Sequence, residues 1–212
     1  MTRIEKNGTL SRLAVNLEYP MPESAANSDD QLLRLISSGD EAGFLAFYRR
    51  HQGAVYRFAM QMSGKTEIAE EVTQDVFMVV MASATQYDAG RGSAAAFLYG
   101  IARNFVMRCL ERERQYIALL DDPESERAEP PSTEQNVLDD LTRNERIESL
   151  RKAVLALPPA YREVVVLCDL EEMDYADAAG ALGCAVGTIR SRLHRARALL
   201  MEKMRAGERC AV

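Results

Sequence analysis

The residues 184–200, CAVGTIRSRLHRARALL, gather four arginines and one histidine without an acidic residue among them. The whole chain has a formal net charge of −6, so the positive charge of this segment is opposite in sign to that of the chain as a whole. Guanidinium groups bind phosphate oxygens and the O6 and N7 atoms of guanine. A charged helix that faces only solvent usually carries both acidic and basic side chains. Here no acidic side chain follows until Glu202. The segment therefore predicts a helix that binds DNA.

Helical spacing divides this segment into two faces. At 100° per residue, Ile189, Leu193, Ala196 and Leu200 share a stripe that we expect to pack inward. The opposite face carries Gly187, Ser191, His194, Arg195 and Ala198, with Thr188 near its edge, Arg190 and Arg197 on one flank and Arg192 on the other. Ser191, His194 and Arg195 are predicted to reach base edges, and the flanking arginines to meet phosphates.

A short helix is expected just before the arginine-rich helix. Asp174 is a predicted N-cap with Asp177 three residues on, and Gly183 is expected to end this helix. A short helix, a tight turn and an arginine-rich second helix form the pattern of a helix-turn-helix, whose second helix enters the major groove.

Other helices must position this motif. Ser28 with Gln31 predicts a helix start, Gly64 the end of a long second helix, and Thr66 the cap of a third. In that third helix Ile68, Val72, Val76 and Val79 are expected on one face. In the next, AAAFLYGIARNFVMRCLERERQYIALL, the inward residues are expected to be Phe97, Ile101, Phe105 and Cys109 or Leu110. Beyond, Ile147, Leu150, Val154 and Leu157 mark a helix that stops at Pro158-Pro159. The segment PAYREVVVLCDL is expected to start another helix, with proline in its first turn.

An acidic segment separates two groups of helices. Residues 121–140 hold eight acids, one base and three prolines and lack helical periodicity, which is typical of a flexible linker. We predict an all-α protein of two small helical domains: a flexible extension at 1–27, a domain at 28–117, an acidic linker at 118–143, a helix-turn-helix domain at 144–206 and a tail at 207–212.

Composition disfavours several classes of function. The four cysteines form no Cys-x-x-Cys pair and only two histidines are present, so neither a metal site nor a cofactor is expected. No apolar run approaches a membrane span or a secretory signal, so a cytoplasmic protein without membrane insertion is expected. The fragment GKT at 64–66 lacks the earlier glycine of a P-loop, because position 59 is alanine. No catalytic residues are predicted, and the chain is not expected to be an enzyme.

Two blocks of the chain resemble the extracytoplasmic-function (ECF) sigma factors of bacterial RNA polymerase. In the first block AEEVTQDVF, YDAGRGS and FLYGIARN stand in the family's order and spacing. The second block likewise matches the family's order and spacing, in LPPAYREVVVLCDLEEMDYADAAGALG and VGTIRSRLHRAR. The resemblance implies a sigma-2 domain followed by a sigma-4 helix-turn-helix domain. It implies a transcription initiation factor with three partners: bacterial core RNA polymerase, promoter DNA and an anti-sigma factor that holds it until stress.

The resemblance also implies roles for particular residues. Contact with core polymerase is expected from Glu70, Glu71, Gln74, Asp75 and Phe77. Recognition of the −10 element is expected from Tyr87, Asp88, Arg91 and Ser93 on a loop and from Arg103, Asn104 and Arg108 on the following helix. Recognition of the −35 element is expected from Thr188, Arg190, Ser191, Arg192, His194, Arg195 and Arg197. Two roles remain possible for Phe77: an apolar anchor for core polymerase or a residue of the protein's own core. Arg103 could equally have a structural or a phosphate-binding role.

The sequence departs from the family where its members place tryptophans. Met81 and Phe97 stand there, and both are expected to pack in the core. One alternative is a helix-turn-helix regulator that acts without core polymerase, for which the AEEVTQDVF helix would have no use. Another is a sigma mimic that binds an anti-sigma factor without binding DNA, which the arginines of the last helix disfavour.

Overall fold

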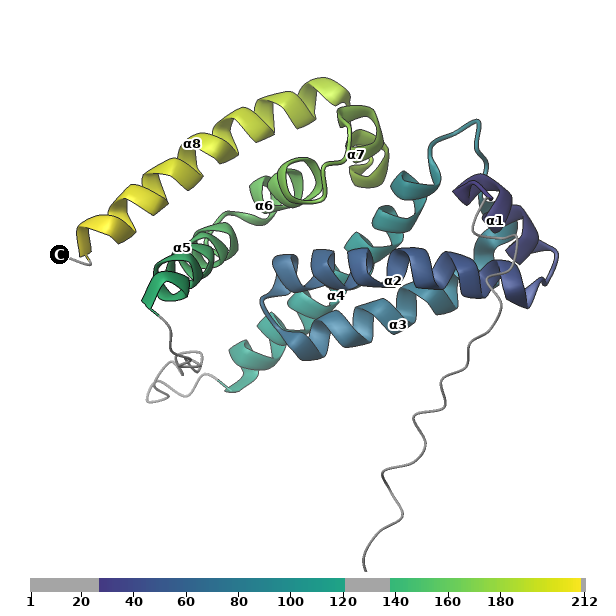
Figure 1. Ribbon diagram of the computed structural model, residues 1–212, viewed down its shortest axis with the longest axis horizontal. Coiled ribbons are helices and arrows are strands. Elements are labelled where there is room, and N and C mark those ends of the chain that lie inside the picture. The colour runs from purple at the N-terminus through teal and green to yellow at the C-terminus, as the bar shows by residue number, and fades with distance from the viewer. Residues whose placement is uncertain (1–26, 121–137, 211–212) are drawn as a thin grey trace, which may run out of the picture.

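The computed structural model describes residues 27–120 and 138–210, with side chains described for 27–116 and 146–205. Within these ranges every regular element is helical, as the sequence predicts, and no strand occurs. The N-terminal half comprises α1 (Asp29–Ser37), α2 (Glu41–Ser63), α3 (Thr66–Ser83), the 3₁₀ turn η2 (Ala84–Gln86) and α4 (Ala94–Leu120). The C-terminal half comprises α5 (Leu138–Leu155), α6 (Pro159–Val165), the π-helical turn η3 (Val166–Leu170), α7 (Tyr175–Leu182) and α8 (Val186–Cys210) (Figure 1).

Local capping signals set most helix ends. Ser28 and Gln31 form a reciprocal capping box at the start of α1, which confirms the predicted start. Gly64 adopts the left-handed region with φ of 73° and ends α2 where predicted. The predicted cap at Thr66 is wrong: Lys65 occupies the N-cap position and Thr66 is the first helical residue. Helix α3 starts without a side-chain cap, and Ser63 Oγ instead accepts a hydrogen bond from the Lys65 N–H at 3.2 Å.

The N-terminal half buries one face of each helix around Phe47, Phe58 and Val72, all fully buried. In α3 the fourth inward residue is Val80, since Val79 is only half-buried. The burial of these apolar side chains is the main stabilising contribution to such a helical bundle.

The predicted inward stripe of α4 is displaced by one residue. Leu98, Ala102 and Val106 are completely buried, whereas the predicted Phe97, Ile101 and Phe105 are half-buried and pack at the edge of the core. Cys109 is buried as predicted. The reason is that α4 packs against α2 and α3 on one side and against α7 on the other, which widens its buried face beyond a single stripe.

The C-terminal half follows its turn signals. Pro159 stands at the first position of α6, Asp174 accepts a hydrogen bond from the Asp177 N–H, and Gly183 ends α7 with φ of 61°. Ile147 is an exception to the predicted stripe of α5, because 43% of it is exposed. Helix α5 begins at Leu138, inside the predicted linker, and α8 continues to Cys210, inside the predicted tail. The remainder of the linker at 121–137 and the extension at 1–26 lie outside the described residues.

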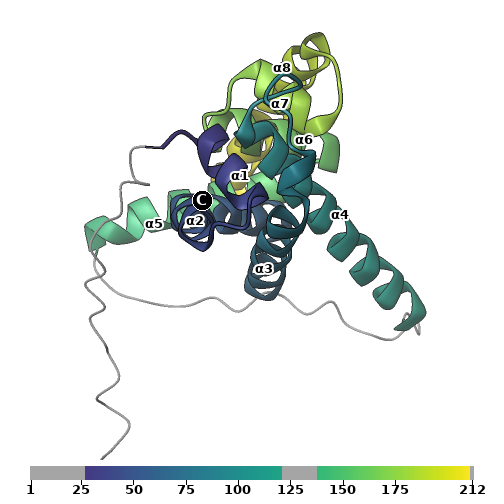
Figure 2. The ribbon, with the colours of Figure 1, turned by 90° about the vertical axis from the view of Figure 1, so that its right-hand side faces the viewer.

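The two halves pack on each other through α4 and α7. Figures 1 and 2, at right angles, both place α7 beside the N-terminal part of α4. The glycine on α7 favours this approach, because a Cβ at Gly180 would lie only 3.3 Å from the Ala96 Cβ. A Cβ at Gly100 would lie 3.5 Å from the Ala181 carbonyl oxygen, which is an ordinary contact distance. None of the described helices combines the length and apolarity needed to span a bilayer.

Candidate nucleic-acid interface

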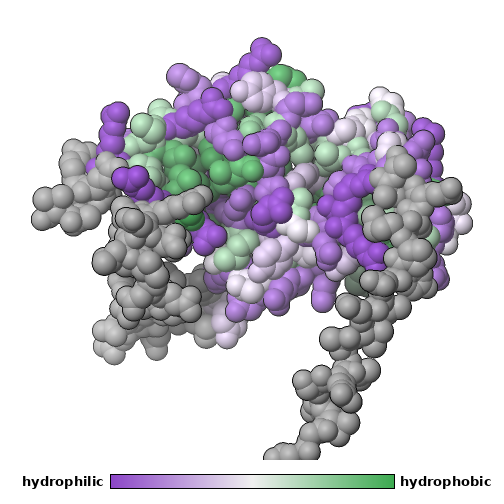
Figure 3. Space-filling model, viewed as in Figure 1, coloured by the Kyte–Doolittle hydropathy of each residue, from purple (hydrophilic) through white to green (hydrophobic). Residues whose placement is uncertain are grey.

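Helix α8 presents its basic face to solvent. Ile189, Leu193 and Ala196 are buried as predicted, and Leu200 is half-buried. The predicted outward residues Gly187, Ser191, His194, Arg195 and Ala198 are all exposed. In Figure 3 hydrophilic side chains project along the outer edge of α8, whereas apolar ones gather between α5 and α8. The packing of α8 therefore fixes which side of the helix faces a ligand.

The arginines of α8 differ in how they are held. Arg190 and Arg195 are exposed and Arg192 is half-buried, and no described acidic side chain forms an ion pair with these three. Arg197 instead makes a bidentate pair with Asp169, with Nε 3.0 Å and Nη2 2.5 Å from the carboxylate oxygens. This hydrogen-bonded carboxylate raises the pKa of Arg197. The pair ties α8 to η3, so Arg197 has a positioning contact that the sequence did not reveal.

Hydrogen bonds within the loop between η2 and α4, and from this loop to α1 and α4, hold it in place. The Tyr87 hydroxyl donates to the Asp30 carboxylate, and its ring lies 5.5 Å from that of Phe97. Burial, reinforced by Asp30, raises the pKa of Tyr87, which keeps the hydroxyl protonated. Asp88 Oδ1 accepts from the Gly90 N–H at 2.9 Å, and Ser93 Oγ accepts from the Ala96 N–H at 3.0 Å. Among the predicted loop residues, Asp88 and Arg91 remain exposed.

Helix α4 carries the other predicted −10 residues in different environments. Asn104 and Arg108 are exposed, with the Arg108 guanidinium 4.3 Å from the centroid of the Phe105 ring. Arg103 points to the C-terminal half, where its Nε lies 2.8 Å from Glu163 Oε1. The structure therefore brings Asn104 and Arg108 to the surface and holds Arg103 in an ion pair between the halves.

Helix α3 exposes the acidic part of the predicted partner surface. Glu70, Glu71 and Gln74 are exposed, and Asp75 is half-buried. Glu71 Oε1 lies 2.7 Å from Arg112 Nη2, so Glu71 is linked to α4.

Burial decides the open question at Phe77 and tests the expectation for Met81. Phe77 is 3% exposed and its ring packs edge-on against Tyr48 at 4.8 Å, which matches the core interpretation. The expectation that Met81 packs in the core is wrong, because 56% of it is exposed. The adjacent position Val80 fills the core instead, so the helix turns Met81 outward. Phe97, at the other tryptophan position, is half-buried against the core.

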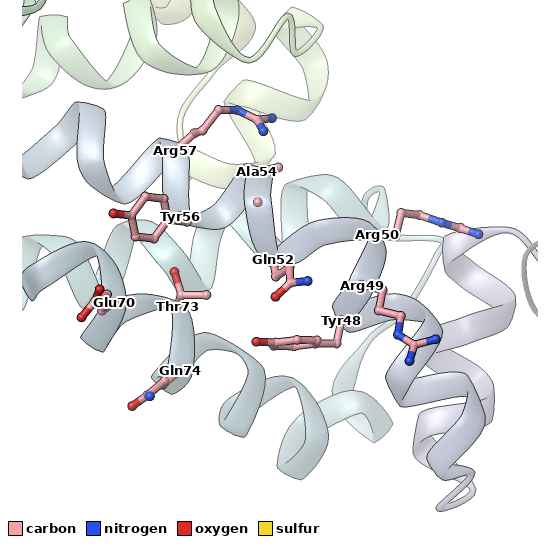
Figure 4. Close-up of a pocket in the computed structure, with 11 residues that line it drawn as sticks. Tyr48, Arg49, Arg50, Gln52, Ala54, Tyr56, Arg57, Glu70, Thr73 and Gln74 are labelled. Carbon is pink, nitrogen blue, oxygen red and sulfur yellow. The ribbon is translucent and has the colours of Figure 1, made fainter. Parts of the chain in front are cut away.

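A cleft beside α3 was not predicted. Figure 4 shows Tyr48, Gln52 and Tyr56 of α2 facing Glu70, Thr73 and Gln74 of α3. The cleft is open, has a volume of about 590 Å³ and also includes Arg49, Arg50 and Arg57. No pattern in the sequence marked Tyr48 or these arginines as parts of a cleft. Within the described ranges no three or more His, Cys, Asp or Glu side chains group with metal-binding geometry.

Two family models match the chain. The sigma-70 region 2 model matches residues 47–116, which cover most of α2, all of α3 and most of α4. The sigma-70 region 4 model matches residues 147–200, which include α6, α7 and the basic part of α8.

Curated relatives and solved structures agree with these matches. The ECF RNA polymerase sigma factor SigM of Mycobacterium tuberculosis is 31% identical over 178 residues, which cover 82% of this chain and 83% of SigM. SigE of Mycolicibacterium smegmatis is 33% identical over 78% of this chain, and the match spans 64% of SigE.

Two solved complexes share the fold. The sigma factor RpoE bound to the anti-sigma factor NepR from Bartonella quintana superposes with a TM-score of 0.58 at 28% identity, covering 73% of this chain and 91% of RpoE. CnrH in complex with the cytosolic domain of CnrY superposes with a TM-score of 0.63 at 25% identity, covering 85% of this chain and 99% of CnrH.

Proposed function

Because this chain belongs to the ECF sigma factors of bacterial RNA polymerase, we propose that it binds core polymerase and directs it to promoters with a −35 and a −10 element. The observation that carries the proposal is the combination of two surfaces on one chain. An exposed arginine-rich recognition helix lies in the C-terminal half, and an exposed acidic helix lies in the N-terminal half. Such a protein positions a polymerase on DNA and is not itself an enzyme. It would act in the cytoplasm, where core polymerase is.

We assign the −35 element to the outer face of α8. Ser191, His194 and Arg195 are exposed on the side that faces away from the core, so they can reach base edges in the major groove. Arg190 and Arg192 flank that face and are placed to meet phosphates on either side, with Thr188 at its edge. Arg197 supports this helix through its pair with Asp169, which uses Nε and Nη2, and Nη1 of this exposed side chain can still meet a phosphate.

We assign the −10 element to the loop 87–93 and the exposed side of α4. A base drawn out of the stack requires a pocket and cations along the strand. Arg91, Asn104 and Arg108 are exposed there, while Tyr87 and Ser93 hold the loop and the start of α4 in place. Asn104 is the proposed base contact, because an amide offers both a donor and an acceptor.

We assign core polymerase to the exposed face of α3, with Glu70, Glu71 and Gln74 as its polar contacts. Carboxylates on a rigid helix form charge-assisted hydrogen bonds with a basic partner. The cleft between α2 and α3 extends this surface with tyrosine and amide side chains. Asp75 lies at its edge, and Phe77 supports the surface from inside the core.

A charge reversal on α3 tests this assignment. Glu70→Lys should weaken the binding of purified core polymerase by about 10-fold to 100-fold, because a like charge facing a basic partner is repulsive. Glu70 is exposed, so the thermal midpoint of the variant should stay close to that of wild type. The measurement is a titration of labelled protein with core polymerase in the absence of DNA.

The matched control is Glu202→Lys, which makes the same charge change at an exposed position of α8. It should leave core binding within twofold of wild type. Equal losses in both variants would show that overall charge, and not the α3 surface, determines the affinity.

The silent state of the protein is expected to involve an anti-sigma factor. One solved neighbour is a sigma factor in complex with the anti-sigma factor NepR, and in another CnrH is in complex with the cytosolic domain of CnrY. We propose that this chain likewise has an inhibitory protein partner that is released under stress. The alternative of a regulator that acts without core polymerase is not favoured, since the region 2 match and the acidic α3 surface would then have no role.

A further inference from the structure

The first turn of α1 carries two adjacent carboxylates that face different parts of the molecule. Asp29 lies beside two side chains of α2, with its oxygens 2.6 Å from Arg50 Nη1 and 3.0 Å from His51 Nε2. Asp30, the next residue, accepts a hydrogen bond from the Tyr87 hydroxyl. Tyr87 follows η2 and opens the loop that we assign to the −10 strand. The start of α1 therefore contacts both the long helix α2 and this loop.

Helix α1 is itself anchored, so the carboxylate of Asp30 has a defined position. The helix packs across one end of α2 (Figure 1). Its buried residues are Leu32, Leu33 and Ile36. Arg50 also donates to the Asn27 carbonyl oxygen at 3.0 Å, which fixes the residue before the N-cap. The nearby His51 and Arg50 hold the pKa of Asp29 below its ordinary value against the opposing effect of burial, so this carboxylate stays ionised at neutral pH.

The Tyr87 hydroxyl connects the loop to this anchored helix. Besides Asp30, the hydroxyl lies 3.3 Å from the Gly92 carbonyl oxygen, near the other end of the loop. A hydroxyl has one hydrogen to donate, and a carboxylate is a stronger acceptor than a neutral carbonyl, so Asp30 is its main acceptor. The ring of Tyr87 packs against Phe97, with 5.5 Å between the ring centroids. Both the ring and the hydroxyl of Tyr87 are therefore held by the protein itself.

The other hydrogen bonds of the loop shape it locally. The side chain and the carbonyl oxygen of Asp88 accept from backbone N–H groups two and three residues further on, each at 2.9 Å. Ser93 Oγ accepts from the backbone at the start of α4, at 3.0 Å. Among the hydrogen bonds described for residues 87–93, the one from Tyr87 to Asp30 reaches a helix that does not adjoin the loop in sequence. This contact therefore orients the loop against the helical bundle.

We propose that Asp30 is a positioning residue for −10 recognition, which orients the loop through Tyr87 so that the exposed Arg91 faces the strand. Asp29 contributes by anchoring α1 on α2. Without the contact the loop takes other orientations, and the apparent affinity for the strand falls with the fraction of molecules whose loop is correctly oriented. This inference rests on the proposed function, because it takes the loop as part of the −10 surface.

Three variants of the full chain isolate this contact. Asp30→Ala removes the acceptor. Tyr87→Phe removes the donor and keeps the ring that packs against Phe97. Asp30→Asn keeps a carbonyl oxygen that accepts the same hydrogen bond. The matched control is Glu41→Ala, which removes an exposed acid from the first turn of α2.

The measurement is binding of the complex with core polymerase to a single-stranded oligonucleotide that carries the −10 sequence upstream of a mapped start site. Asp30→Ala and Tyr87→Phe should each weaken this binding by about tenfold and reduce the discrimination between oligonucleotides that differ at one base. The double variant should lose no more than either single variant, because both changes remove the same contact. Asp30→Asn should stay within about threefold of wild type, and Glu41→Ala within about twofold.

A purely structural role of Asp30 predicts a different pattern. If Asp30 acts on the loop alone, Asp30→Ala should bind core polymerase and a −35 duplex within about twofold of wild type, because those surfaces are distant. An equal loss on all three ligands would overturn the positioning role. It would also be overturned if Asp30→Ala bound the oligonucleotide as well as Glu41→Ala does, if Asp30→Asn lost as much as Asp30→Ala, or if the losses of Asp30→Ala and Tyr87→Phe were additive.

A second pair of variants separates this inference from the proposed function. Arg91→Ala and Asn104→Ala remove exposed side chains of the proposed −10 surface and should each weaken binding of the same oligonucleotide. If both bind it as wild type does, the −10 assignment fails and the positioning role of Asp30 fails with it. If both lose binding while Asp30→Ala does not, the −10 assignment stands and only the positioning role fails.

Discussion

Replacing Arg195 by alanine should lower the affinity for the preferred −35 duplex by about 10-fold to 100-fold and relax the preference at one base pair. Arg195 is exposed in the middle of the outer face of α8, and no described acid pairs with it. A bidentate contact with guanine contributes about 1–3 kcal/mol of discrimination against the wrong base. The measurement is equilibrium binding of holoenzyme to a set of duplexes that differ at single −35 positions.

Arg192→Ala is the matched comparison. Arg192 lies on the flank of the same helix and is half-buried, so we expect a phosphate contact. This variant should weaken all duplexes alike and reduce the slope of log affinity against log salt by about one. If both variants lose affinity equally on every duplex, the assignment of the two faces of α8 is wrong.

The second large effect concerns the packing that orients α8. Leu193 is 2% exposed, on the stripe opposite the DNA-facing side. Leu193→Ala removes buried methyl groups and leaves a cavity, so it should lower the free energy of unfolding by about 2–5 kcal/mol. Urea unfolding followed by circular dichroism would measure this change, and −35 binding should be lost in parallel.

Ser191→Ala serves as its control, because this residue is exposed and its Oγ donates a hydrogen bond within α8, to the Thr188 carbonyl oxygen at 3.1 Å. Its free energy of unfolding should change by no more than about 0.5 kcal/mol. A loss below about 1 kcal/mol for Leu193→Ala would contradict the packing described for α8.

Features that depend on neighbours in sequence could be predicted. The capping box at Ser28, the N-cap at Asp174 and the left-handed glycine at Gly183 each require only a few consecutive residues. The two faces of α8 were predictable for the same reason, since a single packed side gives a single apolar stripe. The resemblance to the family also allowed the two-domain organisation to be predicted, and the matches to the region 2 and region 4 models support it.

Features that depend on distant partners could not be predicted. The inward residues of α4 are displaced by one position because the helix is packed on two sides, and α7, which covers the second side, is far away in sequence. Met81 is exposed because Val80 takes the core position. The pairing of Arg103 with Glu163 joins residues 60 positions apart, and no local pattern marks a glutamate that tertiary packing will bury.

The central claim is that this protein directs core polymerase to promoters. The most direct test combines the purified chain, bacterial core polymerase and fragmented genomic DNA of the source organism, and sequences the run-off transcripts. We expect discrete start sites that require both proteins and share two upstream elements. Binding to DNA without any binding to core polymerase, and with no start site dependent on the chain, would contradict the account.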